Sequence, residues 1–126
     1  MTTFKGSCHC GAVKFEVRNQ EKLQDLKRCD CSLCRKKGVV MAGVKLQDLV
    51  VTEGEDQLSL YQWNTKIAKH YFCSHCGIYT HHQRRVAPDE YGFNVACIEG
   101  VDLGNLGEVP MTDGRSLELV DDNERH

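Results

Sequence analysis

Seven of the eight cysteines in this chain lie in three short clusters, and these clusters limit the possible folds more than any other feature. The clusters are Cys8-His9-Cys10, Cys29-Asp30-Cys31-Ser32-Leu33-Cys34 and Cys73-Ser74-His75-Cys76. With only one or two residues between cysteines, a single tight turn can present two thiolates to one ion at the zinc–sulfur distance of about 2.3 Å. Scattered core cysteines would not produce three such clusters. We therefore interpret the clustered cysteines as zinc ligands.

The sequence favours a cytoplasmic location, in which clustered cysteines bind metal instead of forming disulfides. Residues 1–6 contain neither an apolar run nor a small-residue cleavage site of the secretory type. No segment has the roughly 18 apolar residues that a membrane span needs. The net charge of -2 gives no basis for broad binding to nucleic acid or to an anionic membrane, so we expect neither as a partner.

Hydrophobic alternation predicts a mainly β protein with little helix. Between residues 11 and 18, Val13, Phe15 and Val17 alternate with charged residues, which is typical of a half-buried strand. Only residues 20–27 favour one or two helical turns, with Leu23 and Leu26 facing inward. Further strand-like segments, separated by Gly, Asp, Asn and Ser, occur at 39–44, 49–52, 58–63, 69–72, 78–83 and 92–98.

The length of 126 residues predicts a single domain, and neither a repeat nor a linker divides it. We place this domain at residues 1–120. In the polar last stretch, Leu117, Leu119 and Val120 favour pairing as an edge strand. From residue 121 to residue 126 we expect a mobile C-terminal tail. A chain of this size buries a feasible but modest core, so a bound metal would add useful stability.

Spacing alone leaves open which clusters share an ion. In one arrangement, Cys31 and Cys34 join Cys73 and Cys76 in a ribbon-type site built from two CxxC turns. In the other, the first cluster joins the third, and the second cluster forms a separate group of three thiolates. A zinc ion with three protein ligands keeps a fourth position for water or substrate, which is typical of catalytic zinc. In the second arrangement, any chemistry would therefore belong to the group of three.

The residues around the clusters carry a family resemblance. The segments concerned are Gly6-Ser7-Cys8-His9-Cys10-Gly11-Ala12-Val13, Cys29-Asp30-Cys31-Ser32-Leu33-Cys34-Arg35-Lys36-Lys37-Gly38, Tyr71-Phe72-Cys73-Ser74-His75-Cys76-Gly77 and Tyr91-Gly92-Phe93-Asn94-Val95-Ala96-Cys97. In this order they resemble the glutathione-dependent formaldehyde-activating enzyme family, which includes centromere protein V. Asp30 departs from the family, in which many relatives have another polar residue, often His. The resemblance covers most of the chain and leaves out the C-terminal tail.

This resemblance implies a tent-like arrangement of antiparallel sheets in one small domain that is stabilised by two zinc ions. A structural zinc would be held by Cys8, Cys10, Cys73 and Cys76. A catalytic zinc, with its fourth position open to a thiol or water, would be held by Cys29, Cys31 and Cys34. The implied activity is that of a carbon-sulfur lyase. In it, glutathione or a related thiol combines with the aldehyde formaldehyde to give S-hydroxymethylglutathione, and the reverse reaction also occurs.

Other residue types near the clusters have a functional and a structural interpretation. The runs Arg35-Lys36-Lys37 and Arg84-Arg85 could hold the carboxylates of a peptide, although short basic runs are more often solvated turns. Tyr61 and Trp63 lie on one face of a predicted strand and could line a pocket, but core packing is favoured. Cys97 has no closely spaced partner, so we interpret it as a small buried side chain.

The histidines are candidates for proton transfer. His81 and His82 are expected to face opposite sides of a strand, and one of these or His70 could act as a general acid or base. Because sulfur ligands would fill the structural zinc site, we interpret His9 and His75 as solvent-facing residues or neighbours of the ligands.

Two other classes of function stay open. One is a non-enzymatic zinc-stabilised binding module in which both zinc ions are structural. The other is a redox protein that uses a CxxC motif, but no βαβ pattern accompanies either motif. Iron could also replace zinc among four thiolates, and a visible absorption spectrum would separate the two metals.

Overall fold

The structure is a computed structural model that describes residues 2–29, 31–62, 68–84 and 87–112. Some expectations fall on other residues: the edge strand and tail within 113–126, and the side chains of Asp30, Trp63 and Arg85, lie outside the described residues. Within the described ranges, no helix is both long enough and apolar enough to cross a membrane.

In the described part of the chain, strands predominate and helix is scarce, which confirms the predicted mainly β class. The strands are β1 (Thr2–Ser7), β2 (Lys14–Gln20), β3 (Arg28–Cys29), β4 (Met41–Lys45), β5 (Leu49–Glu53), β6 (Leu58–Tyr61), β7 (Lys69–Cys73), β8 (Tyr79–Gln83), β9 (Glu90–Asn94) and β10 (Met111–Thr112). The helices are α1 (Ser32–Lys37) and the short 3-10 helices η1 (Leu46–Asp48), η2 (Glu55–Gln57), η3 (Val95–Cys97) and η4 (Leu103–Asn105).

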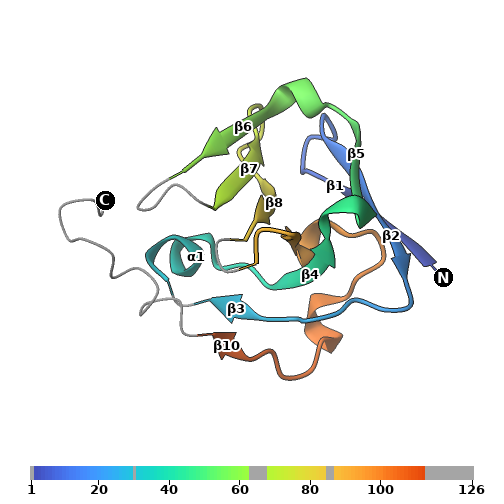
Figure 1. Ribbon diagram of the computed structural model, residues 1–126, viewed down its shortest axis with the longest axis vertical. Coiled ribbons are helices and arrows are strands. Elements are labelled where there is room, and N and C mark those ends of the chain that lie inside the picture. The colour runs from blue at the N-terminus through green and yellow to red at the C-terminus, as the bar shows by residue number, and fades with distance from the viewer. Residues whose placement is uncertain (1, 30, 63–67, 85–86, 113–126) are drawn as a thin grey trace.

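Two antiparallel sheets form the sides of a tent (Figure 1). One has the strand order β1-β2-β5, and the other has the order β4-β9-β8-β7-β6. In Figure 1 the first sheet lies on the right, β6 and β7 lie at the upper left with β8 near the centre, and the chain from β5 through η2 to β6 joins the two sheets at the top. A third pair, β10 with β3, is parallel, which the prediction of antiparallel sheets did not include.

The largest core cluster contains side chains from both sheets. Phe15 and Val17 of β2 meet Ala42 of β4 and Phe93 of β9, and all four are at most 1% exposed. Full burial of a Val or Phe side chain stabilises a fold by about 1.5–3 kcal/mol. Val13, which the alternation placed on the same face, packs instead against cysteines of the neighbouring cluster. The alternation therefore predicts the inward face of β2 correctly. Residues on this face contact both the main core and the neighbouring cysteines.

The predicted helix at residues 20–27 is wrong. β2 continues to Gln20, and the following segment is extended because it pairs with β4: Lys27 and Met41 exchange backbone hydrogen bonds of 2.9 and 2.8 Å. Asp25 has a φ of 58°, which is incompatible with a right-handed helix. Leu23 and Leu26 nevertheless pack against the core, as predicted. The spacing of these two leucines is compatible with a helix, but backbone pairing with β4 holds the segment in an extended conformation.

The helix that does form, α1, replaces a predicted turn. Cys31 is its N-cap, because its Sγ accepts the backbone N–H of Cys34. Gly38 ends the helix with a φ of 65°, and its N–H bonds to the Cys34 carbonyl at 3.0 Å. The basic run occupies the last turn, where positive charge is favourable at the carbonyl end of a helix. Two cysteines of the second cluster are thus positioned by this six-residue helix, Cys31 as its N-cap and Cys34 within it, whereas Cys29 lies in β3.

The late strand is also shorter than predicted. β9 ends at Asn94, whose side-chain oxygen accepts the backbone N–H of Ala96 at 3.1 Å and begins η3. Cys97 closes this turn and is 9% exposed, which confirms its interpretation as a buried side chain.

Gly54 allows the turn after β5 to approach the first cysteine turn closely. Its φ is 77°, and a Cβ atom there would lie 1.9 Å from the carbonyl oxygen of Ala12. We expect Gly54→Ala to destabilise the domain by about 2–4 kcal/mol, because strain and overlap both oppose it. Thermal denaturation against a Gly104→Ala control measures this effect, since the nearest atom to a Cβ at Gly104 is 3.3 Å away. Equal melting shifts in the two variants would contradict the prediction.

Candidate metal centres

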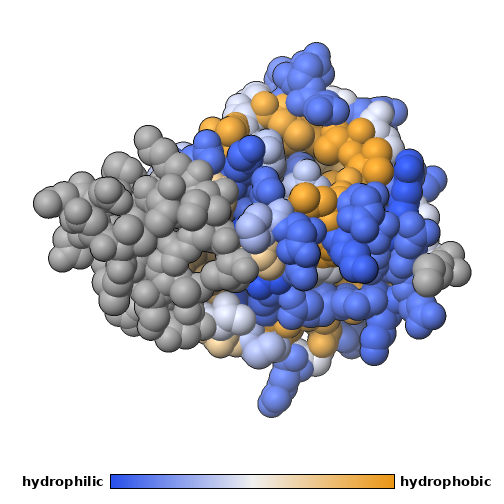
Figure 2. Space-filling model, viewed as in Figure 1, coloured by the Kyte–Doolittle hydropathy of each residue, from blue (hydrophilic) through white to orange (hydrophobic). Residues whose placement is uncertain are grey.

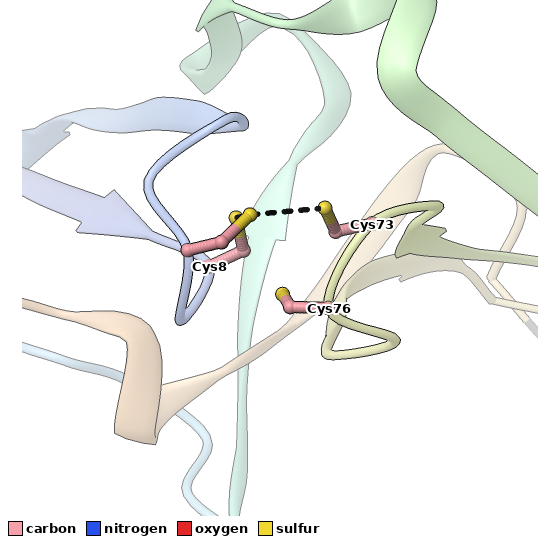
Figure 3. A group of neighbouring side chains, drawn as sticks. Cys8, Cys73 and Cys76 are labelled. Carbon is pink, nitrogen blue, oxygen red and sulfur yellow. Dashed lines mark hydrogen bonds between the residues drawn. The ribbon is translucent and has the colours of Figure 1, made fainter.

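Four cysteine sulfurs from two distant turns come together in a cluster that we call the tetrad. Its Sγ atoms lie within 4.8 Å of one another, and its members are Cys8, Cys10, Cys73 and Cys76. Cys8 and Cys10 belong to the turn between β1 and β2, whereas Cys73 ends β7 and Cys76 precedes β8. In Figure 3, Cys8 faces Cys73 and Cys76 across the gap between these turns. The tetrad therefore joins the three-stranded sheet to the five-stranded sheet.

The tetrad has the dimensions of a tetrahedral metal site. Cys10 Sγ lies 3.7 Å from the Sγ atoms of both Cys8 and Cys73. A tetrahedron of thiolates at the zinc–sulfur distance has edges of about 3.8 Å. Backbone N–H groups of Val13 and His75 point at the sulfurs of Cys8 and Cys73, at 3.3 and 3.4 Å. The spacing and these donors fit a group of thiolates around one divalent ion.

A second group of sulfurs, which we call the triplet, lies at α1. Its members are Cys29 at the end of β3, Cys31 at the N-cap of α1 and Cys34 within the helix, and their Sγ atoms are within 4.8 Å of one another. The Cys34 N–H donates to Cys31 Sγ at 3.3 Å, and the Cys34 side chain is 7% exposed. The two groups are separate, so the ribbon-type arrangement that the spacing left open does not occur.

The triplet sulfurs share protons unequally. Hydrogen bonds from the thiols of Cys31 and Cys34 hold the pKa of Cys29 far below its usual range. The hydrogen bonds to Cys29 and Cys31, together with burial, raise the pKa of Cys34 strongly. Without metal, hydrogen bonding and burial therefore favour a proton on the Cys34 sulfur. A divalent cation fits here, because thiolate ligands bind metal by releasing such protons.

The basic run that the sequence offers for anion binding lies on α1, and only Lys37 points into the protein. Arg35 and Lys36 are exposed, whereas Lys37 Nζ lies 2.9 Å from His70 Nδ1 and 3.6 Å from the centre of the Tyr79 ring. Tyr79 packs in the same cluster as Cys34, so Lys37 lies beside the triplet. The prediction treated the three basic residues alike. A helical spacing of three residues from Cys34 to Lys37 could have singled out Lys37, but the helix itself was not predicted.

Two of the histidines proposed for proton transfer lie on the same side of the five-stranded sheet as the triplet. His70 stacks on His82, with ring centres 5.0 Å apart, and His82 Nδ1 lies 2.5 Å from the Tyr79 hydroxyl. Burial lowers the pKa of His70 to about 3 and that of His82 well below its usual value, so both rings are neutral at pH 7. A Cβ at Gly92 would lie 2.4 Å from the His82 ring, so glycine there makes room for the ring.

His81 faces the other way, as predicted. Its ring stacks on Tyr71 at 4.8 Å and lines a cleft of about 430 Å³ together with Tyr91 and residues of β5 and β6. Figure 2 shows hydrophobic side chains gathered in the upper part of the molecule, where β5 and β6 lie in Figure 1. Because neighbouring residues of β8 point to opposite faces, this cleft and the triplet lie on opposite sides of the sheet. His81 is therefore no candidate for proton transfer at the triplet.

Several other predicted residues lie away from both groups. Arg84 pairs with Asp25 and Glu90 at 3.4 and 2.7 Å, so its charge is already compensated. Tyr61 ends the edge strand β6 and is 42% exposed, which contradicts the favoured core packing. His9 and His75 are exposed within the tetrad turns, as interpreted from the sequence.

Comparison with known proteins gives consistent results. The family profile described as "Glutathione-dependent formaldehyde-activating enzyme" matches residues 3–107. A curated relative from Halomonas elongata, named "Putative glutathione-dependent formaldehyde-activating enzyme", is 38% identical over an alignment of 80 residues; the match covers 57% of this chain and 50% of the relative. The aligned region thus spans about half the length of that relative. The crystal structure of a Rhodobacter sphaeroides protein has a TM-score of 0.82 and 56% identity, and the match covers 86% of this chain and 99% of that chain.

The profile match includes every residue of the tetrad and of the triplet. It also spans both sheets of the tent apart from Thr2, the first residue of β1, and it ends before β10. The resemblance seen in the cysteine segments is thereby confirmed. The chain belongs to the glutathione-dependent formaldehyde-activating enzyme family.

Proposed function

We propose that this protein catalyses the addition of glutathione, or a related thiol, to formaldehyde and the reverse carbon-sulfur cleavage. In the forward direction a carbon–sulfur bond forms, and the thiol proton passes to the carbonyl oxygen to give S-hydroxymethylglutathione. The family to which the chain belongs supports the two substrates. The observation that carries the proposal is the difference between the two cysteine groups, because four sulfurs converge in the tetrad and three in the triplet.

We assign zinc to both groups, with a structural role at the tetrad and a catalytic role at the triplet. Thiolates in tetrahedral geometry favour zinc, and four ligands complete a structural site whereas three leave a position for substrate. Zinc at the triplet would supply a Lewis acid that lowers the pKa of a thiol or polarises a carbonyl oxygen. Cys29, Cys31 and Cys34 would hold it there.

The surroundings of the triplet suit a small charged thiol. Arg35 and Lys36 are exposed on α1 next to the triplet and are candidates for binding the carboxylates of the thiol substrate. On the buried side, Tyr79 and Met41 pack against Cys34 and exclude water from the sulfur. Neutral His70 and His82 do not compete as cations for those carboxylates.

Exchange NMR of glutathione with formaldehyde tests this proposal. We expect the zinc-loaded protein to increase the exchange rate above the spontaneous rate, and we expect the Cys31→Ser variant to lose at least 90% of the increase, on the order of the ten-fold or larger losses caused by disturbing a metal site. Exchange that stays at the spontaneous rate would contradict the proposal and favour a non-enzymatic binding module. Exchange that Cys31→Ser leaves intact would place any activity outside the triplet.

A further inference from the structure

Lys37 is a cation held on the buried side of the triplet. Its Nζ contacts His70 Nδ1 at 2.9 Å and lies over the face of the Tyr79 ring. His70 and Tyr79 are 6% and 7% exposed. The aromatic face stabilises a cation there. The position of the ammonium group is therefore set by two buried side chains of the five-stranded sheet.

The groups around Lys37 are arranged to receive a cation. His70 is neutral, so its Nδ1 lone pair accepts a hydrogen bond from the Lys37 ammonium. The His70 ring is fixed by stacking on His82, whose Nδ1 is hydrogen-bonded to the Tyr79 hydroxyl at 2.5 Å. The face of the same Tyr79 ring contacts the Lys37 ammonium group. Histidine and tyrosine thus fix the direction of the ammonium group and bring no negative charge to it.

The negative charge that Lys37 needs comes from the triplet. Among the described residues, no carboxylate oxygen lies within 4.0 Å of Lys37 Nζ. Burial lowers the pKa of Lys37 to about 8, whereas negative charge on the sulfurs of Cys34, Cys31 and Cys29 acts to raise this pKa. A buried cation is costly unless it is paired with an anion. The Tyr79 ring under Lys37 Nζ packs in the same cluster as Cys34, so the sulfurs of the triplet are the groups beside Lys37 that can carry negative charge among the described residues.

We propose that Lys37 is the counter-cation of the triplet, where it offsets the excess negative charge of three thiolates around a divalent metal ion. Two positive charges and three thiolates leave a net charge of −1, and the ammonium brings the total to zero. This inference rests on the proposed metal at the triplet. A thiol that loses its proton at the triplet adds one more negative charge, and Lys37 lies where it would offset that charge too. It is a positioning residue, since it acts through the ligands.

Release of zinc from the loaded protein to chelators of graded affinity tests the role of Lys37. The Cys31→Ser variant identifies which released equivalent belongs to the triplet. We expect Lys37→Met to release the triplet zinc ion to a chelator whose zinc affinity is about ten-fold lower than the unmodified protein requires. This is the usual size of effect for a side chain that supports metal ligands. The tetrad equivalent is expected to stay unchanged. Lys36→Met, on the same helix and with the same loss of charge, is the matched control for zinc release alone. In this assay, which contains no thiol substrate, it is expected to release the triplet zinc at the same chelator affinity as the unmodified protein.

Lys37→Arg separates charge from packing. It keeps the positive charge, so we expect its triplet equivalent to be released within about three-fold of the unmodified protein, well inside the ten-fold effect of removing support for a ligand. Equal release from Lys37→Met and Lys36→Met would overturn the inference, and so would equal weakening by Lys37→Met and Lys37→Arg. A parallel shift of both equivalents in Lys37→Met would show general destabilisation and would also overturn it.

This measurement is independent of the exchange reaction. If the loaded protein shows no exchange above the spontaneous rate but Lys37→Met loses the triplet zinc selectively, the proposed function fails and the inference stands. If exchange is accelerated but Lys37→Met retains the triplet zinc, the function stands and the inference fails.

Discussion

The Cys73→Ser variant is expected to be largely unfolded at room temperature. Cys73 is fully buried, and its sulfur lies 3.7 Å from that of Cys10 on the other turn. The tetrad joins the β1–β2 turn to the β7–β8 turn, and these turns belong to different sheets. Binding of a structural zinc contributes roughly 10 kcal/mol or more to folding. Because a domain has a net stability of about 5–15 kcal/mol, losing most of this contribution removes the folded state.

Circular dichroism and thermal denaturation measure this effect, and Cys97→Ser is the matched control. Cys97 is also a buried thiol, but it belongs to neither the tetrad nor the triplet. Its replacement buries a hydroxyl group near the Tyr79 carbonyl and is expected to cost about 1–3 kcal/mol while leaving a cooperative transition. If Cys73→Ser melts as cooperatively as Cys97→Ser, the tetrad does not carry the folding energy that we assign to it.

Alternation predicts β2 because one face of this strand lies in the core and the other is more exposed. Phe15 and Val17 show the pattern because their neighbours in β2 are exposed or only half-buried. β1 was not predicted, since its residues are mostly exposed and alternate weakly. The segment at 20–27 has inward leucines at a helical spacing, but its hydrogen bonds go to β4. Long-range pairing of this kind leaves no local signature in the sequence.

The cysteines that converge in the two groups could be identified as candidate metal ligands from the sequence, whereas the side chains around them could not. Close spacing is typical of metal-binding cysteines, so Cys31 and Cys34 are recognised as candidate ligands from the sequence alone. Lys37 lies in a basic run whose sequence is typical of a solvated turn. The inward orientation of its side chain depends on α1 and on strands β7 and β8. Tyr79 and His70 are separated from Lys37 by more than thirty positions in the sequence. Their convergence is a property of the sheet, which sequence periodicity does not reveal.

The Cys31→Ser variant is expected to keep the fold and to lower the zinc content from two ions to one per chain. The structural role of Cys31 is to cap α1, where its Sγ accepts the Cys34 N–H at 3.3 Å. Serine is a preferred N-cap residue, so its hydroxyl oxygen can accept this bond and the helix survives. Serine is a poor zinc ligand in comparison with a thiolate, so two sulfurs remain and the triplet loses its metal.

Metal analysis and thermal denaturation of the same samples check this division between the two cysteine groups. The Cys31→Ser protein should contain one zinc and keep its melting temperature within about 4 °C, which for a domain of this size corresponds to about 1 kcal/mol. The cap is retained and the tetrad is untouched, so nothing that joins the two sheets has changed. Unfolding of Cys31→Ser to the same extent as Cys73→Ser would mean that both groups are structural. In that case the triplet would hold the fold together, and the position that we assign to a substrate would have to be explained by a ligand from the protein itself.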